Sequence, residues 1–172
     1  MAVIEGKRLK TVSVTKEIQD TASAAYVAGE VVSDNSSGGT IWTFSAIAKV
    51  DGGTGYIVKA HVISETTSIT PRLTLFLFNA AVTAELDDQA ANTQLLHTDL
   101  AKYVGKIDFP AMEDLGSGVS EAVATPSTTG NLPLAFECAA AADDLYGVLV
   151  TRDAFIQVAA KDMTIRITAE QY

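Results

Sequence analysis

The stretch TPRLTLFLFNAAVTAELDDQAAN, Thr70–Asn92, decides the fold of this chain and raises the main question about its function. Within it, RLTLFLFN (Arg72–Asn79) alternates with a period of two, which is the pattern of a β-strand. One face carries Leu73, Leu75 and Leu77, and the other carries Thr74, Phe76 and Phe78. Because both faces are apolar, the pattern predicts a central strand covered on both sides, or a strand covered on one side and used at an interface on the other.

The second half of the stretch, AELDDQAAN (Ala84–Asn92), loses the alternation and gathers acidic side chains. Asp87–Asp88 is one double aspartate, and Asp143–Asp144 is another further along the chain. A calcium-binding loop supplies its oxygen ligands at a fixed spacing and ends on a bidentate glutamate. That spacing is absent here. The segment is therefore interpreted as an exposed connector or a helix cap, with an ion site at Asp87–Asp88 as the alternative.

Period-two alternation recurs along almost the whole chain, and turn-forming residues separate the runs. The other expected strands are Leu9–Ile18, Tyr26–Val32, Ile41–Val50, Tyr56–Ser64, Lys102–Phe109, Val119–Thr125, Leu132–Cys138, Leu145–Arg152 and Met163–Tyr172. DGGTG (Asp51–Gly55) follows Ile41–Val50 directly and predicts a β-hairpin with Tyr56–Ser64, whose glycines adopt positive φ. At most a short helix is expected, within Thr83–Tyr103. Short strands without alternating helices predict an all-β antiparallel sandwich or barrel.

The organisation of the chain is expected to be simple. Its 172 residues suit one domain. Residues 26–172 are expected to form a single β-sandwich, and residues 1–25 an extended N-terminal arm with the first strand. SDNSSGGT (Ser33–Thr40) and TPSTTGN (Thr125–Asn131) are polar and rich in small residues. They predict two flexible connectors at one end of the sandwich, where binding surfaces are often built.

Composition and charge narrow the range of partners. Hydrophobic residues make up 48% of the chain and charged residues 19%, which indicates a globular protein and excludes overall disorder. The formal net charge is −9, so the surface repels nucleic-acid phosphates and anionic lipid headgroups. The N-terminus lacks the apolar stretch of a signal peptide, and no apolar run is long enough to span a membrane. We therefore expect no nucleic-acid partner and no membrane partner.

No set of residues predicts catalysis or cofactor binding. Cys138 lies among apolar neighbours and is expected to be a small buried side chain. His61 is expected to face solvent or a partner, and His97 to lie in a loop; with one cysteine these two histidines do not make a zinc site. DGGTG lacks the lysine of a phosphate-binding loop, and no helix follows it. The sequence thus predicts no catalytic, cofactor-binding or metal-binding residue.

The order of several short motifs resembles a known family. YVAGEVVSDN, GGTGYIVKAHVIS, RLTLFLFN, an Asp-rich loop and YVGKIDF follow one another between Tyr26 and Phe109. This order is similar to that of small proteins encoded by tailed bacteriophages, whose members with an assigned role are capsid decoration (cement) proteins with a jelly-roll-like sandwich. No site residue is carried over from them, because AELDDQAAN departs from the family's plainer Asp-Asn pattern.

The resemblance implies a structural virion protein, made in the host cytoplasm and located on the capsid exterior. Its partners would be the major capsid protein and further copies of itself, as a homotrimer in preference to a dimer. The segment Met1–Ala25 would lie across a neighbouring subunit. Two other classes stay open. One is a carbohydrate- or receptor-binding module of a phage tail or baseplate, with Trp42 stacking on the sugar. The other is a cupin-like or hydrolytic enzyme, which the presence of only two histidines disfavours.

Overall fold

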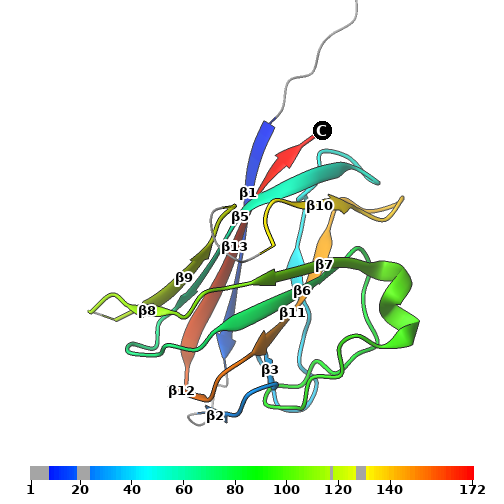
Figure 1. Ribbon diagram of the computed structural model, residues 1–172. Coiled ribbons are helices and arrows are strands. Elements are labelled where there is room, and N and C mark those ends of the chain that lie inside the picture. The colour runs from blue at the N-terminus through cyan, green and yellow to red at the C-terminus, as the bar shows by residue number, and fades with distance from the viewer. Residues whose placement is uncertain (1–7, 19–23, 117, 127–130) are drawn as a thin grey trace, which may run out of the picture.

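Two antiparallel sheets pack face to face in the computed structural model, which describes residues 8–18, 24–116, 118–126 and 131–172 (Figure 1). The larger sheet contains β1 (Arg8–Ile18), β13 (Lys161–Gln171), β5 (Thr54–Ser64), β9 (Ser120–Ala124), β8 (Glu113–Asp114) and β10 (Leu134–Glu137). The smaller sheet contains β3 (Val31–Val32), β11 (Leu145–Thr151), β6 (Leu73–Phe78), β7 (Tyr103–Asp108) and β4 (Trp42–Phe44). A ribbon of β2 (Ala24–Tyr26) and β12 (Phe155–Gln157) and one 3₁₀-helix, η1 (His97–Lys102), complete the described part.

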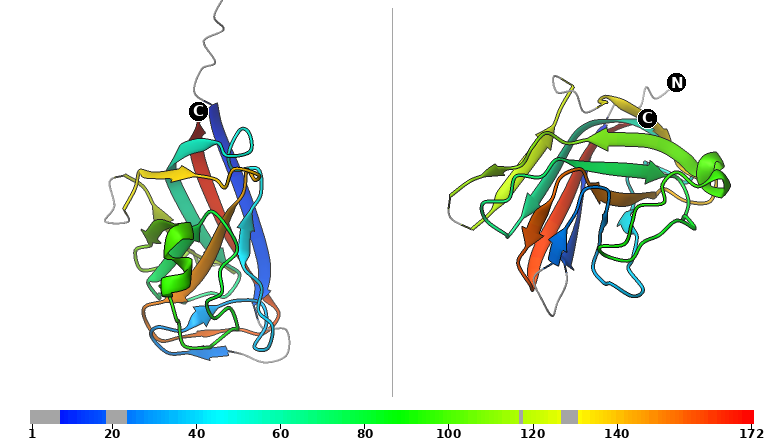
Figure 2. Two further views of the ribbon diagram at one scale, coloured as in Figure 1. Left: turned by 90° about the vertical axis from the view of Figure 1, so that its right-hand side faces the viewer. Right: turned by 60° about the horizontal axis from the view of Figure 1, so that its bottom comes forward.

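The strand pairing is that of a jelly roll. Eight strands in chain order form four nested antiparallel pairs: β1 with β13, β3 with β11, β5 with β10, and β6 with β7. Further pairing of β13 with β5 and of β11 with β6 joins these pairs into two sheets. Such nesting arises when one long antiparallel ribbon wraps around a core, and Figure 2 shows the two layers from the side. The predicted all-β, jelly-roll-like sandwich is confirmed.

Strand β5 is the centre of the larger sheet. One edge of β5 pairs with β13 along almost its whole length. The other edge is shared, because Thr54–Ile57 pair with β10 and Ala60–Ser64 pair with β9. The hairpin of β8 and β9 is thus an addition to the eight-strand pattern, inserted between β7 and β10.

Every residue of β6 is buried, as the alternation predicted for a central strand. Leu73, Leu75 and Leu77 point into the core between the sheets. Phe76 and Phe78 belong to a second apolar cluster with Val31, Val148 and Val150. Val82 and Leu86, from the segment that follows β6, pack against this second cluster. The chain itself covers the Phe side of β6, and the alternative of a partner there is wrong.

The predicted hairpin of Ile41–Val50 with Tyr56–Ser64 is also wrong. β4 ends at Phe44 and pairs with β11, whereas β5 belongs to the other sheet. The chain turns at Ala46 (φ 53°), and the consecutive residues Ile47 and Ala48 are both buried. Two adjacent buried residues break a period of two, so this segment crosses the end of the sandwich instead of extending a strand. Of the three glycines expected to have a positive φ, Gly52 does, at 67°, whereas Gly53 and Gly55 do not.

The expected strand Tyr26–Val32 is interrupted. β2 ends at Tyr26 and β3 begins at Val31. Between them the chain turns at Gly29, whose φ of 92° is readily adopted only without a Cβ. The short helix expected within Thr83–Tyr103 is η1, at the end of that range.

Within residues 1–25 the predicted first strand is confirmed, and it pairs within its own chain instead of lying across a neighbouring subunit. Arg8–Ile18 form β1, which pairs with β13 in one uninterrupted register from Arg8 opposite Gln171 to Ile18 opposite Lys161. Val12 and Val14 pack against the core of the same chain. This burial and the backbone hydrogen bonds make β1 part of the sandwich. Residues 1–7 and 19–23 of the expected arm lie outside the described residues.

Candidate functional site

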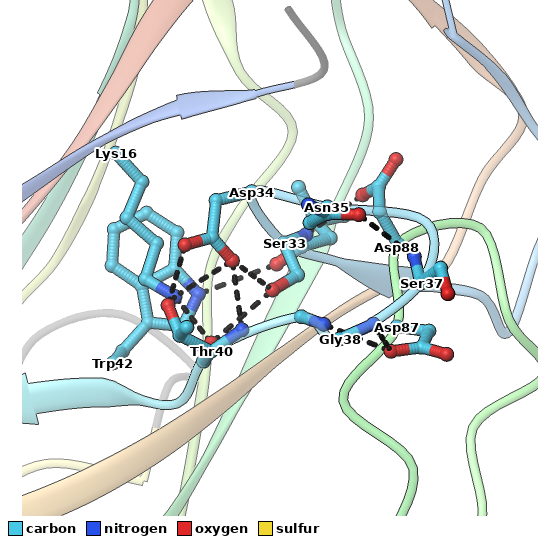
Figure 3. A network of polar contacts seen from close by, with 12 residues as sticks. Lys16, Ser33, Asp34, Asn35, Ser37, Gly38, Thr40, Trp42, Asp87 and Asp88 are labelled. Carbon is cyan, nitrogen blue, oxygen red and sulfur yellow. Dashed lines mark hydrogen bonds and ion pairs between the residues drawn. The ribbon is translucent and has the colours of Figure 1, made fainter.

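A network of polar side chains lies where the loop 33–40 meets the acidic segment after β6 (Figure 3). Lys16 reaches this loop from β1, and Asp87 and Asp88 reach it from the acidic segment. These residues come from three separate parts of the chain. This polar network contains Asp87 and Asp88, the acidic pair that the sequence marks as the main candidate site.

Lys16 is the buried cation of the network. Its side chain is 7% exposed, and its Nζ donates to Thr40 Oγ1 at 2.7 Å and to the Thr40 carbonyl oxygen. The same Nζ lies 3.4 Å from Asp34 Oδ1 and 5.1 Å from the centroid of the Trp42 ring. Burial lowers the pKa of Lys16, and the Asp34 carboxylate opposes that shift. Every near neighbour of this ammonium group thus stabilises the charged form.

Asp34 organises the loop around this cation. Its Oδ1 accepts hydrogen bonds from the Thr40 backbone N–H at 2.8 Å and from the Ser33 hydroxyl at 3.0 Å, and its Oδ2 accepts from the Thr40 hydroxyl. Burial alone would raise the pKa of Asp34. The Thr40 hydrogen bonds, together with Lys16 and Ser33, outweigh burial and lower the pKa to about 2. The loop Ser33–Thr40, expected to be a flexible connector, is thus held by its own carboxylate. Most of the other expected connector, Thr125–Asn131, lies outside the described residues.

Asp88 is buried and holds two other elements together, which corrects the expectation of an exposed acidic connector. It is 3% exposed, and its Oδ1 accepts hydrogen bonds from the Tyr26 hydroxyl at 2.6 Å and from the Ser33 backbone N–H at 2.7 Å. Burial and the charge of Asp88 raise the pKa of Tyr26. Tyr26 therefore keeps its proton and donates a hydrogen bond to Asp88, and the carboxylate fastens the acidic segment to β2 and to the loop.

Asp87 continues this attachment. Its Oδ1 accepts hydrogen bonds from the backbone N–H groups of Gly38 at 2.6 Å and Gly39 at 2.8 Å. These two bonds lower the pKa of the carboxyl group. Gly39 has no room for a side chain, since a Cβ there would lie 2.0 Å from the Leu86 carbonyl oxygen. The glycine pair thus lets the two loops meet backbone to backbone, a role that the residue pattern did not reveal.

The charged groups of the network make hydrogen bonds that join three parts of the chain. Its carboxylates accept hydrogen bonds from neighbouring backbone and hydroxyl groups, and its one amine is enclosed by acceptors. In the part of the chain that the structure describes, no three histidine, cysteine or carboxylate side chains gather as a metal site would require. We conclude that Asp87 and Asp88 hold in place the segment after β6, whose Val82 and Leu86 cover the second apolar cluster.

The other acidic pair, Asp143–Asp144, has a similar structural use. The Asp144 carboxylate accepts a hydrogen bond from the Ala46 backbone N–H at 2.9 Å, and the Asp143 carbonyl oxygen accepts one from the Ala48 N–H at 3.0 Å. Both bonds fix the chain where it crosses from one sheet to the other. Cys138 is buried, as predicted, and burial with the charges of the two aspartates raises the pKa of its thiol to about 12.

The other residues that the sequence singled out as possible site residues, His61, His97 and Trp42, do not form a common site. His61 is half-buried, and its Nε2 lies 2.7 Å from Glu121 Oε2. His97 is exposed at the start of η1. Trp42 is 1% exposed and donates to the Val32 carbonyl oxygen at 3.3 Å, so the suggestion that it stacks on a sugar is wrong. Among the described residues, no helix is long and apolar enough to cross a membrane.

One exposed apolar surface was not anticipated from the sequence. The β2–β12 ribbon buries Tyr26 and Phe155, whose rings stack with centroids 4.6 Å apart. The residues that alternate with the buried ones are exposed, and we call them the apolar ribbon face: Ala25, Val27, Ala154, Ile156 and Val158. Ile156 is 61% exposed and lies directly opposite Ala25. The period of two that reveals this face spans only a few residues in each strand, which is too short to recognise in the sequence.

No protein-family model matches the chain, and no curated protein matches it. Solved structures similar to it include one of Desmodium yellow mottle tymovirus, at 12% identity and a TM-score of 0.28 over 99% of this chain and 91% of that one. Another is the structure of Triatoma virus, at 12% identity and a TM-score of 0.24 over 93% of this chain and 62% of that one. Likenesses at this level carry no argument; the jelly-roll assignment rests on the strand pairing.

Proposed function

We propose that this chain is a structural protein of a bacteriophage virion, which decorates and stabilises the capsid by binding the major capsid protein from outside. The role is that of a cement protein and involves no catalysis. The family resemblance of the motif order suggests it, and the jelly-roll sandwich provides a rigid body suited to it. The apolar ribbon face is the observation that carries the proposal.

The apolar ribbon face suits a protein contact. Ile156 and Val27 are 61% and 58% exposed, on a ribbon whose other side is fixed by the Tyr26–Phe155 stack. Its five outward side chains carry no charge, so another protein can cover them without desolvating an ion. Exposed apolar patches on otherwise polar surfaces commonly mark such contacts.

The use of the polar groups supports a structural role as well. The carboxylates that first suggested chemistry hold loops together, and the cysteine is buried with a raised pKa. The net charge of −9 disfavours nucleic acid and anionic membranes as partners. In a homo-oligomer, with a trimer favoured over a dimer, several ribbon faces would engage one shell together and so strengthen weak individual contacts.

Sedimentation with capsid shells tests the proposal. Purified protein is mixed with shells that lack it, the shells are pelleted, and bound protein is measured against concentration. We expect saturable binding that Ile156→Lys weakens at least about tenfold, because a buried unpaired ammonium group costs more than 1.4 kcal/mol. Leu9→Lys is the matched control, since Leu9 is equally apolar and 66% exposed but lies on β1.

Light scattering on the same protein measures the oligomeric state, and electron microscopy of decorated shells shows where the protein sits. A protein that stays monomeric and does not pellet with any shell contradicts the proposal. If Ile156→Lys and Leu9→Lys lose shell binding equally, the apolar ribbon face is not the surface that contacts the capsid.

A further inference from the structure

A groove is lined by residues that include Tyr172. Figure 1 shows the C-terminus at the end of the sandwich away from the β2–β12 ribbon. The volume of the groove is about 450 Å³, within the range of small-molecule sites. Residues of β5, β7 and β10 line it together with Asn79, which follows β6, and with Tyr172; its polar and aromatic residues include Thr54, Tyr56, Asn79, Glu137 and Tyr172. We call it the tyrosine groove. None of these residues takes part in the polar network or in the apolar ribbon face.

Two exposed aromatic rings form one wall of the groove. Tyr56 is 43% exposed and Tyr172 is 49% exposed, and their rings meet edge to face with centroids 5.9 Å apart. The Tyr172 hydroxyl donates to Glu170 Oε2 at 3.2 Å, and its backbone N–H donates to the Thr54 carbonyl oxygen at 3.2 Å. Tyr172 is thereby held against β5, and the pair presents a fixed apolar surface.

The residue beside Tyr56 leaves its ring accessible. Ala135 lies directly opposite Tyr56 in the pairing of β10 with β5, and it is small and exposed. In the adjacent pair of β10 with β5, Phe136 lies opposite Gly55. The Phe136 ring fills the space beside this glycine, because a Cβ at position 55 would lie 2.7 Å from the ring. Phe136 thus packs tightly over the sheet beside the groove, while Tyr56 keeps 43% of its surface exposed for a flat ligand.

Polar groups surround this aromatic wall. Glu137 is exposed on β10 directly opposite Thr54, and Asn79 lines the same groove from the end of β6. Carboxylate and amide oxygens accept hydrogen bonds from hydroxyl groups, and the amide and the threonine hydroxyl also donate. An apolar ring face beside such donors and acceptors matches a sugar, which has an apolar C–H face and a rim of hydroxyl groups. The carboxylates and the net charge of −9 disfavour an anionic ligand.

We propose that the tyrosine groove binds a neutral saccharide, with one sugar ring stacked on Tyr56 and its hydroxyl groups bonded to Glu137 and Asn79. The proposal does not depend on capsid decoration, since a decorating protein and a tail module can both bind glycans. If the chain is a carbohydrate-binding module, its sugar site is thus the tyrosine groove and not Trp42.

Calorimetric titration tests this site with three named probes: maltotriose, cellotriose and N,N′,N″-triacetylchitotriose. We expect saturable binding of at least one probe, with a Kd on the order of 1 mM, as for a small open site. Tyr56→Ala is expected to weaken it at least about tenfold through loss of stacking, and Tyr56→Phe by much less. Leu100→Ala is the matched control, because Leu100 is 48% exposed on η1 and outside the groove.

Circular dichroism confirms that the variants are folded, as expected for exposed positions. The proposal is overturned if the folded wild type binds none of the three probes. It is equally overturned if Tyr56→Ala and Tyr172→Ala bind as tightly as the wild type. Loss of shell binding in Tyr56→Ala, without saccharide binding by the wild type, would assign the groove to a protein contact and so reject a sugar site.

Discussion

The two sides of β6 are both buried, but by different means. On the Leu side, the opposing sheet supplies a continuous apolar core, in which Leu75 and Leu77 are 0% exposed. On the Phe side, Val82 and Leu86 cover Phe76 and Phe78 from a segment with almost no regular structure. In a sheet, the backbone N–H and C=O groups form hydrogen bonds with the neighbouring strands. An irregular segment lacks such neighbours, so each of its buried backbone groups needs a separate hydrogen-bond partner.

Carboxylates supply those partners on the Phe side. Asp99 is 0% exposed and accepts hydrogen bonds from the Thr83 backbone N–H, next to Val82. Asp87 and Asp88, next to Leu86, bind the glycine pair and the Ser33 N–H. Val82 and Leu86, which cover the Phe side, thus each lie next to a residue through which an aspartate fixes the segment. The acidic character of this segment therefore serves its attachment to the sheet.

The largest effect is expected on the Leu side. Leu75→Ala leaves a cavity in a core that cannot collapse around it and should lower the free energy of unfolding by about 2–5 kcal/mol. Urea denaturation followed by fluorescence and by circular dichroism measures this change, and both probes should give one transition. A loss below about 1 kcal/mol would mean that the sheets are not tightly packed at β6.

A smaller and more local effect is expected for Asp88→Ala. The change leaves the Tyr26 hydroxyl and the Ser33 N–H without their buried acceptor, which should cost about 1–3 kcal/mol. Hydrogen exchange should accelerate in residues 79–92 more than in β5 or β13, because the anchor of the cover is lost. Asp88→Asn keeps one acceptor oxygen and serves as the milder control. Uniform acceleration across both sheets would contradict a separate cover.

Acid should loosen the loop to which this cover is attached. The pKa of Asp34 is about 2 in the folded chain, below its ordinary value of 3.8, so the folded state favours the ionised form. The resulting stability is present above about pH 4 and is lost as the pH falls through 2; it amounts to at most about 2 kcal/mol. Denaturation of the wild type and Asp34→Asn between pH 5 and pH 2 measures it. A similar loss in both proteins would place the effect in other carboxylates.

The smallest effect concerns the closed core of the Leu side, to which Cys138 belongs. Burial raises the pKa of its thiol to about 12, so almost no thiolate forms at pH 8. Native protein should therefore react with Ellman's reagent far more slowly than protein unfolded in urea. Rapid reaction of the native protein would show that the core beside β10 opens readily.

The regular parts of the fold could be predicted because their alternation is long. β1, β5, β6 and β13 each carry a clear period of two, and their observed bounds lie close to the expected ones. The prediction of a hairpin at DGGTG was wrong for a physical reason. A glycine-rich turn lets the chain reverse direction, but it does not determine which sheet the next strand joins. Asp143–Asp144, almost a hundred residues away, hold that crossing in place.

The polar network and the tyrosine groove could not be predicted residue by residue. Lys16 and Asp34 look like ordinary surface charges in the sequence, and only the closing of β1 against the loop pairs a buried Lys16 with a partly buried Asp34. Tyr56 and Tyr172 are more than a hundred residues apart, and the pairing of β13 with β5 brings them together. Contacts of this kind depend on the register of distant strands, which no local pattern contains.

The sequence by itself determined the all-β class, the central place of β6, the burial of Cys138 and the acidic surface, because composition and periodicity specify which faces avoid water. Only the tertiary structure decided what covers each face. It placed the acidic segment over the Phe side of β6, where Asp87, Asp88 and Asp99 satisfy backbone and hydroxyl donors. It also left the apolar ribbon face and the tyrosine groove open. Both outcomes follow from how distant strands pair, since burial is a property of the assembled sheets and not of one segment.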